Sequence, residues 1–70
     1  MDNSNNTIFL ERILGELKDN IATSESWLHS YGAMAPDYRV REVRRHLEKL
    51  KEDMAEKQAE LNELRSRSSQ

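Results

Sequence analysis

The feature that most restricts the fold is a seven-residue repeat of apolar side chains between residues 40 and 64. The repeat forms two rows, and one charged residue, Lys57, interrupts them. Its members are Val40, Val43, Leu47, Leu50, Met54, Leu61 and Leu64. Alternating steps of three and four residues place both rows on one face of an α-helix, where they form a coiled-coil seam. This segment therefore predicts a helix of about 36–66 that packs lengthwise against another helix.

A second row with the same period lies upstream, within a predicted helix of about 7–31. Its members are Leu10, Leu14, Leu17, Ile21, Ser24, Leu28 and Tyr31. Thr7 is a suitable N-cap for this helix, and Gly32 can end it in the left-handed conformation that other residues avoid. The polar ends of the chain, residues 1–6 and 67–70, are expected to be flexible.

A corner of four residues, 32–35, separates the two predicted helices, and Pro36 then suits the first position of a helix. So short a connection makes the helices antiparallel neighbours. Counting residues outward from the corner pairs each seam residue of the first helix with one seam residue of the second. The last of these pairs sets Leu10 opposite Lys57. The predicted fold class is all-α: an antiparallel two-helix hairpin with a heptad seam, formed by residues 7–66.

This hairpin leaves apolar side chains without cover. Leu61 and Leu64 extend beyond the first helix, while Phe9 and Ile13 lie beside the seam. Full burial of a large side chain is worth about 1.5–3 kcal/mol, and half-burial between two helices does not offset the conformational entropy of folding. We therefore expect self-association through these four residues, as a homodimer that forms a four-helix bundle. The alternative is a fluctuating helical monomer that orders on binding.

The net charge of the second predicted helix changes sign along its length. Residues 37–51 carry a net charge of +3 and residues 52–64 carry −4, whereas the whole chain carries −2. Cations near the start of a helix and acids near its end oppose the helix dipole. An antiparallel copy of the same helix, or an anionic ligand at the corner, would compensate for this arrangement. An ordinary solvated face explains each charge singly, but not their segregation.

Aromatic residues and arginines gather around the predicted corner, which is the composition of binding hot spots. We expect a partner-binding surface made of Trp27, Tyr31, Met34, Tyr38, Arg39, Arg41, Arg44 and Arg45. The tyrosines have an alternative role as the last layer that closes the hairpin, and Trp27, which lies off the seam, fits either role. Arginine guanidinium groups near a helix N-terminus also suit a nucleotide or another phosphate ligand.

No pattern of residues predicts catalysis, a metal site or a cofactor. Glu42 and His46 can share a metal ion, but two ligands do not make an enclosed site. A two-helix hairpin offers no pocket of its own for acid–base or nucleophilic chemistry. There are no cysteines, and no apolar run approaches the ~20 residues of a membrane span. Duplex DNA is disfavoured, because DNA-binding domains are basic and this chain is acidic.

These observations favour a small non-enzymatic protein that binds another protein and modulates it, as an inhibitor, adaptor or assembly chaperone. The first six residues lack the charge and apolar core of a signal peptide, so a cytoplasmic location is expected. Hairpins of this size occur among phage-encoded host-takeover proteins and secretion chaperones, although no motif is shared with them. The second hypothesis is an oligomer that binds a phosphate ligand through the arginines. The third is a purely structural coiled-coil element.

Overall fold

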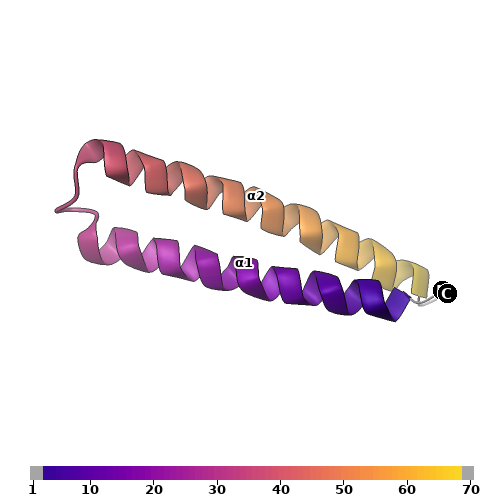
Figure 1. Cartoon of the computed structure of the whole chain (residues 1–70). Helices are drawn as coiled ribbons and strands as arrows, with labels where there is room; N and C mark the ends of the chain where they lie inside the picture. Colours follow the sequence, from indigo (N-terminus) through magenta and orange to yellow (C-terminus); the bar gives the residue numbers. More distant parts are fainter. Residues whose placement is uncertain (1–2, 69–70) are drawn as a thin grey trace.

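The computed structural model describes residues 3–68, which form two long helices joined by a short corner (Figure 1). Helix α1 spans Asn3–Tyr31 and helix α2 spans Asp37–Ser68. The helices lie side by side and run in opposite directions, with the corner at one end of a rod 52 Å long and 14 Å across. The predicted all-α hairpin is therefore confirmed, and residues 3–68 contain no strand.

Helix α1 begins earlier than the sequence predicts. Residues 3–6 are helical rather than flexible, and Thr7 lies inside the helix instead of capping it. At the other end, residues 67–68 continue α2. The remaining predicted flexible residues, 1–2 and 69–70, lie outside the described part of the chain. Asparagine and serine have only modest helix propensity, so the sequence gives little signal for this additional turn.

One edge of the hairpin carries two ion pairs that show how the helices are aligned. Lys51 Nζ lies 3.4 Å from Glu25 Oε2, and Arg65 Nη2 donates a hydrogen bond to Glu11 Oε2 at 2.9 Å. The residue numbers of both pairs share a sum of 76, so both pairs obey a single antiparallel register. All four side chains are about half exposed, so the pairs indicate the register more than they stabilise it. This side of the hairpin is named the ion-pair edge.

The ion pairs correct the predicted register, in which Leu10 lies opposite Lys57. They instead place Leu10 opposite Leu61, and these two side chains are 6% and 2% exposed. In an antiparallel coiled coil, the a positions of one helix face the d positions of the other, whereas the predicted register matched a with a and d with d. The prediction that Leu61 is left without cover is therefore wrong, and Leu64 is partly buried as well.

The core between two helices is thin. The buried apolar side chains among residues 5–67 are Leu10, Leu47, Leu50 and Leu61. The chain exposes 5577 Å² of surface. A compact protein of the same mass exposes about 4500 Å². The hairpin therefore leaves an unusually large part of itself available for further contacts.

The corner depends on Gly32, but not through the left-handed conformation predicted for it. No glycine among residues 3–68 has a positive φ. The amide of Gly32 donates a hydrogen bond to the carbonyl oxygen of Leu28 at 2.9 Å, and a Cβ at this position would overlap that oxygen. Two amides, those of Met34 and Ala35, then donate to the carbonyl oxygen of Tyr31 at 3.0 and 2.9 Å. Glycine is needed here because the backbone of residue 32 lies too close to the carbonyl group of Leu28 to leave room for a Cβ.

Candidate functional site

The eight residues predicted to bind a partner do gather at the corner end of the rod, but they do not form one surface. One group surrounds Trp27 on the side of the hairpin opposite the ion-pair edge, which is named the open edge. A second group, around Tyr38, lies on the outer face of α2. The two groups share a boundary at Glu42, which borders both of them.

The first group lines an open hollow between the two helices. Its volume is about 410 Å³, and its lining residues are Thr23, Ser24, Trp27, Arg39, Glu42, Val43 and His46. Arg39 Nη1 lies 3.2 Å from Glu42 Oε1, so the charge of this arginine is already paired at the rim. Ser24 occupies a seam position, and its small side chain leaves space beside Trp27. A serine within an otherwise apolar row is the signal in the sequence that could have revealed this hollow.

The aromatic rings continue from this hollow to the tip of the corner. The ring centroids of Trp27 and Tyr31 are 6.2 Å apart, with an angle of 43° between the ring planes. A second hollow of about 310 Å³ is lined by Trp27, Tyr31, Met34 and Ala35. Tyr31 is 53% exposed and Tyr38 is 66% exposed. The alternative role of the tyrosines, as a buried last layer of the hairpin, is therefore wrong.

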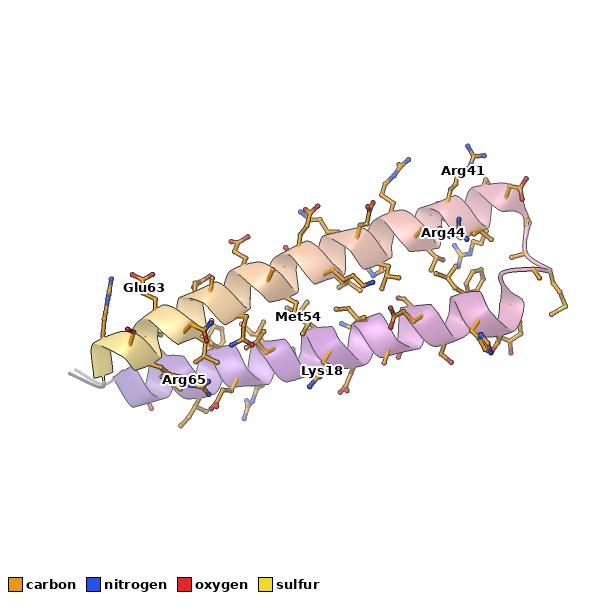
Figure 2. The ribbon with its side chains drawn as sticks, turned by 180° about the vertical axis from the view of Figure 1, so that it is seen from behind. Lys18, Arg41, Arg44, Met54, Glu63 and Arg65 are labelled. Atoms are coloured by element: carbon orange, nitrogen blue, oxygen red, sulfur yellow. The ribbon has the colours of Figure 1, made fainter. Side chains whose placement is uncertain are left out.

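The second group forms a surface on the first turns of α2. Tyr38, Arg41 and Arg45 line a shallow hollow together with Glu42. Steps of three and four residues place these side chains along one line of the helix. Figure 2 shows Arg41 pointing away from α1. These three residues, Tyr38, Arg41 and Arg45, are named the outer patch.

The arginines do not converge on one point. Arg39 belongs to the open edge, where it is paired with Glu42. Arg44 lies on another side of α2 from Arg41, as Figure 2 shows. A phosphate ligand at the corner would therefore meet two neighbouring guanidinium groups, those of Arg41 and Arg45, rather than a cage of four.

The four residues predicted for self-association do not lie on one surface either. Leu61 is inside the hairpin, whereas Phe9 is 62% exposed and Ile13 is partly buried. Phe9 and Trp27 lie on the same line of α1, about five helical turns apart. The surface available to a second copy therefore consists of Phe9, Ile13 and Trp27 on the open edge rather than the C-terminal leucines of α2.

Within residues 3–68, no group of three or more histidine, aspartate or glutamate residues is arranged to hold a metal ion. Neither helix of that part is long and apolar enough to span a bilayer. The chain matches no protein-family model, no curated protein and no solved structure.

Proposed function

We propose that this chain is a non-enzymatic binding module that engages and modulates another protein through the tip of the corner and the outer patch. The observation that carries the proposal is the exposure of Tyr31, Met34 and Tyr38, which lies between 53% and 76%. Tyr31 and Met34 lie together at the tip of the corner, and soluble proteins rarely leave large apolar side chains grouped in this way unless a partner covers them. Tyrosine and arginine are also among the residue types that dominate binding energy.

The chemistry of the outer patch indicates what kind of partner fits it. Tyr38 offers apolar area and a hydroxyl, while Arg41 and Arg45 offer forked donors on the same line of α2. A partner segment that presents an apolar side chain flanked by carboxylates complements this arrangement, because guanidinium groups bind carboxylates in bidentate geometry. By binding such a segment, the hairpin would inhibit the partner or link it to a third protein.

We also propose that the working form is a homodimer in which two hairpins make a four-helix bundle. The support is the surface of the single hairpin, which exceeds that of a compact protein by about 1000 Å². Each partner in a standard protein–protein interface buries about 800 Å². Packing one hairpin against a copy of itself would bring the exposed surface per chain close to the compact value.

The outer patch can be tested by capturing partners from a cell lysate on immobilised protein, purifying the main partner and measuring its affinity for variants. Tyr38→Ala should weaken binding by ~2 kcal/mol, as expected for a hot-spot tyrosine. The double variant Arg41→Ala/Arg45→Ala should weaken it to a similar extent. Arg44→Ala is the matched control, because this arginine does not line the hollow that Tyr38, Arg41 and Arg45 share. The affinity of this variant should stay close to that of the wild type.

The dependence of binding on salt separates this proposal from the other hypotheses. A protein partner held by Tyr38 should lose only modest affinity as salt rises. A ligand that depends on Arg41 and Arg45 but not on Tyr38, and that dissociates steeply with salt, would be a phosphate compound instead. If none of these variants changes binding, the hairpin is a structural coiled-coil element and the proposal fails.

A further inference from the structure

The open edge carries apolar side chains that the hairpin does not cover. Phe9 protrudes near the end of the rod that is remote from the corner, and Ile13 follows it one turn later. The hollow beside Trp27 lies on the same edge, near the corner, and its volume of about 410 Å³ is sufficient for a phenylalanine side chain. A protruding ring and a hollow that fits it therefore lie at the two ends of one edge.

Charges on α2 are divided along the same edge. On the half nearer the corner, Arg39 is paired with Glu42, which leaves His46 and Lys49, among residues 3–68, as the groups without an acid on that side. The acidic residues of the other half are Asp53, Glu56 and Glu60. Steps of three and four residues keep all of these side chains on one side of the helix. A second copy that is turned end to end would bring the basic half of each chain against the acidic half of the other.

We propose that two copies of this chain pack open edge against open edge about a two-fold axis perpendicular to the helices, so that Phe9 of each copy fills the hollow beside Trp27 of the other. The proposal rests on the homodimer proposed above and names its surface. Such an interface is self-complementary, as two-fold symmetry requires. Each helix then packs antiparallel to its own copy, which gives a four-helix bundle.

The arrangement also sets the register of α2 against α2 of the second copy. When Phe9 reaches the hollow beside Trp27, Lys49 comes opposite Glu56 of the other copy. Asp53 then lies next to the axis, opposite its own equivalent. A parallel pairing would instead leave both hollows empty, which favours the antiparallel arrangement.

The contact of Phe9 can be tested by sedimentation equilibrium over a range of protein concentrations. The wild type should be a dimer, and Phe9→Glu should raise its dissociation constant at least about 100-fold, because two buried rings are lost per dimer. Ile8→Glu is the matched control: Ile8 is 58% exposed, but it lies about 100° around α1 from Phe9, away from the open edge. A wild type that is monomeric at about 100 µM overturns the proposal, as does an equal effect of both variants.

The two-fold axis can be located by crosslinking, because the chain has no native cysteine. Asp53→Cys should form a disulfide-linked dimer on mild oxidation, since the two equivalent positions lie together near the axis. Lys51→Cys is the control on the ion-pair edge and should remain uncrosslinked. Crosslinking of Lys51→Cys without Asp53→Cys would place the interface on the wrong edge and contradict the proposal.

A charge exchange provides the decisive test. Lys49→Glu alone and Glu56→Lys alone should each raise the dissociation constant of the dimer, because like charges then face each other twice in every dimer. An equimolar mixture of the two variants should recover a heterodimer, because an acid again faces a lysine at both contacts. If the wild type is a dimer but the mixture recovers no dimer, the homodimer stands and this surface is wrong. If the wild type is a monomer, the proposed homodimer itself is wrong.

Discussion

Leu61→Ala should remove most of the helicity of this protein at room temperature. Leu61 is 2% exposed and lies opposite Leu10 in the layer that the ion pairs define. Truncating a buried leucine to alanine costs about 2–5 kcal/mol. A core this thin supplies little more than that in total. Far-ultraviolet circular dichroism during heating, at one fixed protein concentration, measures the loss.

Leu64→Ala is the matched control for this truncation. It removes the same atoms about one turn further along α2, where the side chain is only partly buried. Its melting temperature should therefore fall clearly less than that of Leu61→Ala. In the register counted from the corner, both leucines lie beyond α1. Equal falls in the melting temperature of the two variants would therefore support that register and contradict the one that the ion pairs indicate.

The two glycines should respond to alanine in opposite directions. Gly32→Ala places a methyl group against the carbonyl oxygen of Leu28, which belongs to the backbone and cannot move aside freely. We expect a destabilisation of about 1–3 kcal/mol, the usual cost of placing an extra methyl group where other atoms already lie. At Gly15 a methyl group would meet nothing within 4 Å. Alanine there should stabilise α1 by about 0.5–1 kcal/mol through its higher helix propensity.

Thermal unfolding of both glycine variants checks this pair of predictions. For a chain of this size, each 1 kcal/mol should move the melting temperature by about 4–8 °C. Gly32→Ala should therefore melt several degrees below the wild type, and Gly15→Ala a few degrees above it. If Gly32→Ala melts with the wild type, the corner adopts another backbone path without cost, and the close approach to Leu28 is not what selects glycine.

The helices and their antiparallel packing could be predicted because each seam repeats many times along the chain. Counting from the corner gives the wrong register because it pairs like heptad positions, whereas antiparallel helices set a positions against d positions. It therefore sets Leu10 opposite Lys57 instead of Leu61. The conformation of Gly32 depends on the backbone path of the corner, which has no periodic signal in the sequence.

The sequence predicts which residues gather near the corner, but it only partly predicts that they form two separate surfaces. Trp27 directly precedes the seam residue Leu28, whereas Tyr38 lies two positions before Val40, so their heptad positions alone place them on different sides of their helices. The hollow beside Trp27 is different, because its shape depends on how the side chains of both helices meet around Ser24. The serine marks the layer of the seam where space is left, but the shape of that space is visible only when the helices are packed together.

The slender shape of the hairpin determines how it will move through solution. Its radius of gyration is 15.9 Å. A compact chain of the same length has a radius of about 11 Å. Friction on a rod exceeds that on a sphere of equal mass, so a single hairpin should elute from a sizing column as a heavier compact protein would. Two hairpins packed side by side thicken the rod without lengthening it, so the frictional ratio should fall as the mass doubles. End-to-end association would raise that ratio instead, which makes diffusion and mass together diagnostic of the assembly.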